Sequence, residues 1–142
     1  MGILKDRLLI TMSALGLLLR LMLASLPGFQ IDVNAWFAWA ERLNQVGFSK
    51  FYSDQIWTNY TPGYLYILYF VGWIKNLLNI SNEQFYLLLK IPSMLVEILM
   101  GIFIYKLISK KSKGLAKVAL AAVLFNPAFI FNSSVWGQID GL

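Results

Sequence analysis

The sequence predicts an all-α membrane protein, a polytopic helical bundle, and three observations lead to this fold class. Of the 142 residues, 58% are hydrophobic and 13% are charged, whereas a soluble domain has roughly 25% charged residues. The apolar residues gather in long runs that a core of this size could not bury completely. The basic residues, which give a net charge of +5, lie beside these runs, so membrane lipids and not nucleic acid are the expected partner of the positive charge.

The chain contains no cysteine and no histidine. This excludes disulfide frameworks, Cys/His zinc sites, haem ligation by histidine and histidine-dependent nucleophiles from these residues. Any proton chemistry must therefore use a carboxylate, a lysine or a tyrosine. The sequence indicates no cofactor with certainty and leaves open whether a divalent metal, held by carboxylates, takes part.

The first predicted span covers residues 8–26. It follows Lys5 and Arg7, ends before Pro27, and is long enough to cross a hydrocarbon core of about 30 Å. A cleaved signal peptide is the alternative, but the apolar run exceeds the usual h-region and residues 24–26 form a poor cleavage site.

The segment 28–61 turns polar and aromatic, which predicts an outer loop at the membrane surface. Within it, apolar residues at helical spacing predict an interfacial amphipathic helix over 33–46, with tryptophans at the level of the lipid headgroups. Asp32 stands at the expected N-cap, and Gly47 at the position where a glycine ends a helix.

Two more predicted spans follow. Residues 81–84 have the spacing of a capping box, which starts a helix near Asn82. This helix continues to about Ser109, with Pro92 as a kink or a second start, and its part from 92 to 109 is the second span. Residues 115–133 form the third span, bent by Pro127.

The orientation follows from the positive-inside rule, which places the N-terminus and a five-lysine cluster in the cytoplasm. The cluster consists of Lys106, Lys110, Lys111, Lys113 and Lys117. An even number of crossings must separate the two basic groups, so one of the three intervening apolar helices does not cross. We expect helix 62–78 to be the one that does not cross, because it is short, rich in Tyr and Trp, and interrupted by Gly72. We expect it to be re-entrant or juxtamembrane.

This topology describes a multi-pass protein of the plasma or inner membrane with its functional face outside. Asp32 and Asp140 then share the outer compartment. In the alternative, helix 62–78 crosses, the lysines face outward and the two acids are separated by the membrane.

Ionisable residues inside the predicted spans are costly in lipid and are functional hypotheses by default. Arg20 must either snorkel toward an interface or face a protein or water interior. For Glu97, a functional role and a structural polar contact between helices remain equally open.

Seven carboxylates are candidate bases or metal ligands: Asp6, Asp32, Glu41, Asp54, Glu83, Glu97 and Asp140. Asp32 is the sharpest candidate, because it follows the first span where a lipid-linked substrate would present its headgroup. From composition alone, a plain N-cap is an equally good interpretation. Asp140, together with Gln138, could hold a sugar hydroxyl, a phosphate-bound metal, or nothing.

From Asp32 onward the chain carries an ordered set of motifs. They are Asp32, Trp39, Gly47, Phe51-Tyr52, Tyr60-Thr61-Pro62-Gly63-Tyr64, Leu89-Lys90-Ile91-Pro92-Ser93, Asn126-Pro127, Asn132-Ser133 and Trp136-Gly137-Gln138-Ile139-Asp140. This set resembles the start of the Gpi18-like mannosyltransferase family, within the C-type superfamily of polytopic membrane glycosyltransferases. The match departs from the family where Thr61 replaces a second proline and where Glu97 stands in place of an aspartate.

The resemblance implies inverting transfer of a sugar from a polyprenyl-phosphate donor to a hydroxyl of a glycan or glycolipid acceptor, on the outer face. It implies Asp32 as the general base, and Gln138, Asp140, Tyr60 and Tyr64 as substrate-binding residues. The leaving phosphate needs a cation, which Lys90 could supply, or Lys90 could simply snorkel.

Because such enzymes have several hundred residues, we expect the chain to be an N-terminal part of one, inactive by itself. Two other functions stay open: a non-catalytic membrane subunit that binds a lipid headgroup, and a fragment of a transporter.

Overall fold

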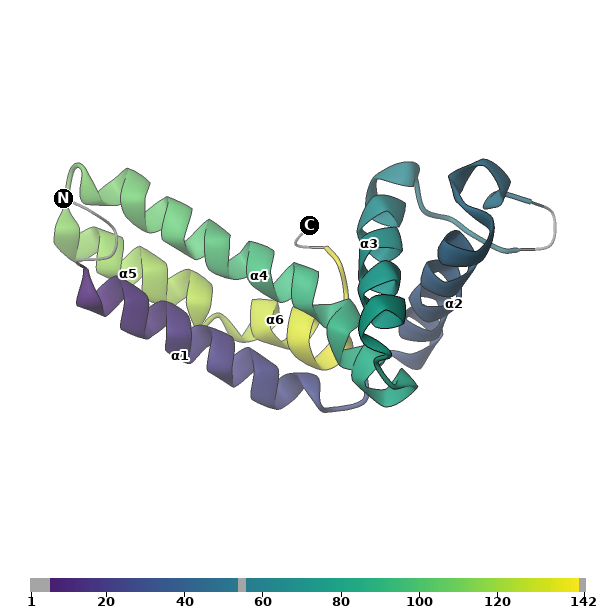
Figure 1. Ribbon diagram of the computed structural model, residues 1–142. Coiled ribbons are helices and arrows are strands. Elements are labelled where there is room, and N and C mark those ends of the chain that lie inside the picture. The colour runs from purple at the N-terminus through teal and green to yellow at the C-terminus, as the bar shows by residue number, and fades with distance from the viewer. Residues whose placement is uncertain (1–5, 54–55, 141–142) are drawn as a thin grey trace. The chain divides into compact units, whose positions relative to one another are not determined.

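The computed structural model describes residues 6–53 and 56–140, and every regular element within these ranges is helical (Figure 1). The all-α prediction is therefore confirmed for this part of the chain. The elements are α1 (Arg7–Ala24), α2 (Gln30–Val46), the short 3₁₀-helix η2 (Phe48–Lys50), α3 (Pro62–Leu78), α4 (Asn82–Ser109), α5 (Lys113–Leu124), α6 (Pro127–Ile130) and the π-helical η3 (Phe131–Trp136).

Among the described residues, three helical stretches are long and apolar enough to cross a membrane: α1, α4 and the path Lys113–Trp136. They contain the core of each predicted span, and they indicate an integral membrane protein. Helix α3, with 17 residues, is not among them. The third stretch is interrupted where Phe125 ends α5, and it restarts at Pro127, which occupies the first position of α6.

The chain folds into two compact units. One contains α1 and the chain from Lys90 onward; the other is Phe29–Leu89. The first carries the long apolar helices, and the second carries most of the polar and aromatic segment that the sequence assigns to the membrane surface.

In the first unit, α1, α4 and α5 share an apolar core made of Leu9, Ile98, Tyr105, Ala116, Leu120 and Leu124. Figure 1 shows α1 and α5 running side by side. Glycines allow close approach: a Cβ on Gly16 would lie 3.4 Å from Leu124 Cβ, and one on Gly101 would lie 2.9 Å from Leu124 Cδ2. Small residues at helix contacts are typical of membrane bundles, where tight packing replaces the hydrophobic effect.

Asp6 caps the N-terminus of α1. Its carboxylate accepts a hydrogen bond from the backbone amide of Leu9 at 3.3 Å and another from the Tyr105 hydroxyl. These bonds, with the Tyr105 hydroxyl contributing most, hold the pKa of Asp6 below its ordinary value of 3.8. The acid that the sequence assigned to the basic end of the chain therefore has a structural role.

Asp6→Asn is expected to destabilise the protein at neutral pH but not in strong acid. A carboxylate with a lowered folded-state pKa adds stability that is complete above the unfolded value of 3.8, and that is lost as the pH falls through the folded value. Asparagine keeps a capping oxygen but not the charge. Thermal unfolding in detergent across this pH range measures the difference, and a gap of equal size at both ends would contradict the prediction. Tyr105→Phe should give the same pH dependence.

In the second unit, α2 and α3 pack closely against each other at Gly72. A Cβ on Gly72 would lie 2.9 Å from the backbone oxygen of Ala40 and even nearer to the side-chain amide of Asn44. That amide donates to the backbone oxygens of Ala40 at 2.9 Å and Tyr69 at 3.1 Å, which ties the two helices together. The prediction that Gly72 interrupts helix 62–78 is wrong, because α3 runs through it without a break.

Gly72→Ala is expected to cost about 1–3 kcal/mol of stability, because the new methyl group meets backbone that cannot yield. Gly63→Ala is the matched control on the same helix: nothing lies within 4 Å of its Cβ position, and alanine favours the helix. Unfolding of both variants in detergent should show a loss only at position 72. Equal stabilities would mean that α2 and α3 can separate without cost.

Several predicted helix ends are confirmed. In the capping box, the backbone amide of Gln84 donates to Ser81 Oγ at 3.3 Å, and the Ser81 amide donates to Gln84 Oε1 at 3.4 Å. Gly47 ends α2 with a φ of 71°, a value at which glycine carries no steric penalty. Pro92 lies inside α4, which continues through it as one helix.

Candidate functional site

Asp32 is the third residue of α2, not its N-cap. The helix begins at Gln30 after Phe29, whose backbone oxygen accepts hydrogen bonds at 3.1 Å from the amides of both Asp32 and Val33. The N-cap prediction for Asp32 is therefore wrong. The half-buried carboxylate lies in the first turn, where the helix dipole favours a negative charge.

An aromatic cluster lies further along the same side of α2. Asp32, Trp36 and Trp39 are spaced at i, i+4 and i+7, so they share one face of the helix. The ring centroids of Trp36 and Tyr64 are 5.8 Å apart, those of Trp39 and Tyr60 are 5.5 Å apart, and those of the two tyrosines are 5.7 Å apart. The fold thus brings both predicted substrate-binding tyrosines against the tryptophan-bearing face that begins at Asp32.

The loop between α2 and α3 is fastened by hydrogen bonds to backbone oxygens. Trp39 Nε1 donates to the oxygen of Trp57 at 3.0 Å, and the Tyr52 hydroxyl donates to that of Tyr60 at 3.0 Å. Arg42 donates to the backbone oxygens of Phe51 and Lys50, both at 3.1 Å, and to the hydroxyl oxygen of Ser53 at 3.0 Å. These bonds fix the position of Tyr60.

The aromatic side chains of this cluster differ in how far they are exposed to solvent. Burial raises the pKa of Tyr64 above its ordinary value, so its phenol is neutral and able to donate a hydrogen bond at physiological pH. Trp57 is 68% exposed, whereas Trp36 and Trp39 are buried. The cluster combines a carboxylate, a neutral phenol and flat apolar rings. Such groups suit a sugar, which has hydroxyls at its edge and C–H groups on its faces. The half-buried Asp32 and Tyr60 and the exposed Trp57 are open to such a ligand, while the buried Trp36 and Trp39 support them from the core.

The second group of predicted site residues follows η3. Gly137 ends this π-helical turn with a φ of 79°, and the amide of Gln138 donates to the oxygen of Asn132 at 2.8 Å. The side-chain amide of Asn132 donates to Asp140 Oδ2 at 3.3 Å. Asn132 therefore orders both ends of the Gln138–Asp140 segment. A π-helical turn is often found at functional sites.

Lys90 is buried and faces a cage of backbone oxygens. Its ammonium group donates to Ala24 at 3.0 Å, Leu26 at 2.8 Å, Ser134 at 3.1 Å and Val135 at 3.2 Å. An ammonium group has only three N–H donors, so these acceptors occupy all of them. The arrangement is not that of a snorkelling lysine, and it does not favour the predicted contact with a substrate phosphate.

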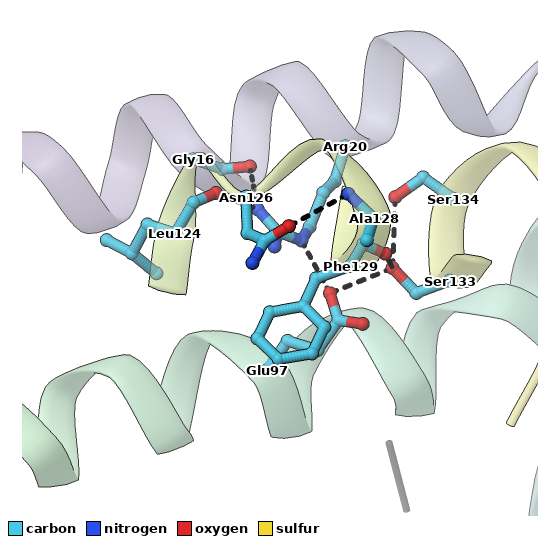
Figure 2. A network of polar contacts seen from close by, with 9 residues as sticks. All are labelled: Gly16, Arg20, Glu97, Leu124, Asn126, Ala128, Phe129, Ser133 and Ser134. Carbon is cyan, nitrogen blue, oxygen red and sulfur yellow. Dashed lines mark hydrogen bonds and ion pairs between the residues drawn. The ribbon is translucent and has the colours of Figure 1, made fainter. Parts of the chain in front are cut away.

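Arg20 and Glu97 form a buried ion pair inside the first unit, with Arg20 Nε 2.9 Å from Glu97 Oε2 (Figure 2). Arg20 also donates to the backbone oxygens of Gly16 at 3.2 Å and Leu124 at 2.7 Å, and Ser133 Oγ donates to Glu97 at 2.9 Å. Figure 2 shows the arginine reaching from α1 toward Glu97 on α4. The network joins three apolar helical stretches, which gives Glu97 a structural partner and excludes snorkelling by Arg20.

Other candidate acids fall elsewhere. Glu41 accepts a hydrogen bond from Lys75 at 2.6 Å, and Glu83 is an exposed residue of the first turn of α4. Asp54 lies outside the described residues. In the ranges 6–53 and 56–140, no three acidic side chains are grouped so that they could hold a metal ion.

Comparisons of the chain with protein-family models, with curated proteins and with solved structures find no match. The resemblance to C-type glycosyltransferases therefore stays a prediction from the motifs.

Proposed function

We propose that the protein is a membrane glycosyltransferase of the C type. It transfers a hexose, with mannose as the leading candidate, from a polyprenyl-phosphate donor to a hydroxyl of a glycan or glycolipid acceptor. One observation carries the proposal: Asp32 begins the tryptophan-bearing face of α2, against which both tyrosines of the Tyr60–Tyr64 motif pack. A base and the buried tryptophans that hold Tyr60 and Tyr64 thus occur on one helix, in motifs that resemble this family.

In the proposed reaction, Asp32 takes the proton of the acceptor hydroxyl as its oxygen attacks C1 of the sugar from the face opposite the phosphate. The new C1–O bond forms as the bond from C1 to the phosphate oxygen breaks, which inverts the configuration. The polyprenyl phosphate leaves as an anion and needs no general acid. Tyr60 and Tyr64 bind the sugar, and Gln138 and Asp140 contact sugar or acceptor hydroxyls.

The test is a transfer assay with the full-length protein in lipid vesicles. The substrates are a polyprenyl-phosphate mannose labelled in the sugar and a glycolipid acceptor, with a nucleotide sugar as the control donor. Labelled acceptor should form from the lipid-linked donor alone. A headgroup-binding subunit would bind the donor without consuming it, and a transporter would move it across the vesicle unchanged. Either result, across a panel of polyprenyl-phosphate hexoses, would overturn the proposal.

The proposed topology, with a cytoplasmic N-terminus and the reaction outside, makes a separate prediction. Single cysteines introduced as Ala38→Cys and Ile139→Cys should react with a membrane-impermeant maleimide added to intact cells. Lys111→Cys, in the lysine cluster, should react only after the membrane is opened. The 142 residues contain no native cysteine to confuse the result. Labelling of positions 38 and 139 from opposite sides would contradict the shared outer compartment.

A further inference from the structure

Lys90 carries a buried positive charge that the proposed reaction does not use. Lys90 is 3% exposed, and its ammonium group is bonded to four backbone oxygens and, within residues 6–53 and 56–140, to no carboxylate. A buried charge is retained only where fixed dipoles or counter-charges compensate for the lost water. In the part of the chain that the structure describes, this compensation comes from main-chain carbonyl groups.

These carbonyls belong to the ends of two helices. Ala24 is the last residue of α1 and Leu26 follows it closely, while Ser134 and Val135 lie in the last turn of η3. The final carbonyls of a helix have no partner within the helix and carry its partial negative charge. One ammonium group therefore satisfies two such ends at once and attracts both.

Hydrogen bonds made by Asn132 connect this cage to the predicted substrate-binding residues Gln138 and Asp140. Ser134 and Val135 are in the same turn as Asn132, whose backbone oxygen holds the amide of Gln138 and whose side chain holds Asp140. A displacement of the end of η3 would therefore move both residues. The cage sets where this turn stands relative to the end of α1.

We propose that Lys90 is a positioning residue, an internal cation that clamps the C-terminal end of α1 to the last turn of η3 and thereby places Gln138 and Asp140. The clamp itself concerns only the fold, whereas its effect on sugar transfer rests on the proposed function. This role differs from that of a phosphate ligand. A covalent cross-link between the end of α1 and the last turn of η3 should replace the clamp, but it could not replace a group that binds the phosphate.

The first part of the experiment measures the clamp itself. Leu26→Cys and Val135→Cys are introduced together into the full-length protein, and their cross-linking by a short bis-maleimide is followed in membranes. Lys90→Met removes the donors at nearly constant volume and should slow the cross-linking several-fold. Lys106→Met, an exposed lysine of the same helix, is the matched control and should leave the rate unchanged. Unchanged cross-linking in Lys90→Met would overturn the proposal.

The second part tests the consequence for transfer. Lys90→Met should lower sugar transfer by roughly 10²-fold, the effect of a small misplacement of binding groups, and the 26–135 cross-link should restore most of the lost activity. A cross-linked Lys90→Met protein that stays inactive, while cross-linked wild type is active, would show that Lys90 acts on the substrate. If Lys90→Met does not fold, Lys90→Gln, which keeps two N–H donors, takes its place with the same outcomes. If wild type transfers no sugar, the proposed function fails, and the cross-linking rates still decide the clamp.

Discussion

Asp32→Asn is expected to lower sugar transfer by about 10²–10⁴-fold, the contribution of a positioned general base. The amide has nearly the same shape as the carboxylate but cannot accept the proton of the acceptor hydroxyl. Because Asp32 is the third residue of α2 and not its cap, the substitution leaves the start of the helix intact. Initial rates with the polyprenyl-phosphate donor, in vesicles containing equal amounts of protein, measure the effect.

The matched control is Glu83→Gln, which neutralises an acid in the first turn of α4 that is exposed to solvent. It should leave both the transfer rate and the amount of inserted protein unchanged. Asp32→Asn should also insert normally and bind the donor with little change. Transfer retained at the wild-type rate in Asp32→Asn would remove Asp32 from the mechanism.

The helix boundaries are the part of the fold that the sequence predicts best. Helix 62–78 was predicted with its observed ends, and Gly47 and the Ser81–Gln84 capping box mark a helix end and a helix start as expected. These signals are local: a proline at the first position, a glycine with positive φ, and a side chain three residues from its partner. These helix starts and ends therefore form without contacts to distant parts of the chain.

The start of α2 shows where local signals compete. An aspartate before an apolar periodic run predicts an N-cap, but Gln30 and Ile31 also accept helical geometry, and no glycine or proline separates them from Asp32. The helix therefore begins earlier, at Gln30, with the backbone oxygen of Phe29 receiving the first hydrogen bonds. The carboxylate consequently lies within the first turn.

The polar groups inside the first unit could not be located from the sequence, because their partners are distant and, for Lys90, carry no residue-type signal. Lys90 is bonded to main-chain oxygens, which every residue has. For Arg20 and Glu97 there was a usable signal: opposite charges within two predicted spans must find partners in the bundle. Pairing them depends on helix packing, and Gly16 contributes to that packing, because a Cβ at this position would lie 3.4 Å from Leu124 Cβ.

Glu97→Gln is expected to destabilise the protein by about 3–5 kcal/mol, because it leaves the fully buried Arg20 guanidinium without its counter-charge. Glutamine has the same shape and can still accept a hydrogen bond from Ser133, so packing changes little and the loss reports on the charge. Arg20→Met should have an effect of similar size, since it leaves the carboxylate unpaired. The free energy of unfolding in mixed micelles gives both values.

The double variant Arg20→Met/Glu97→Gln separates the ion pair from its surroundings. With no charge left, it should be more stable than either single variant and come close to wild type, because replacing both members of a buried pair is often neutral. Ser133→Ala is the control within the network and should cost only about 1 kcal/mol, the usual value of one hydrogen bond. If the two single losses simply add in the double variant, Arg20 and Glu97 are not coupled. In that case the ion pair would add nothing to the connection between the three apolar stretches, which would rest on the Lys90 hydrogen bonds and on the close packing at Gly16 and Gly101.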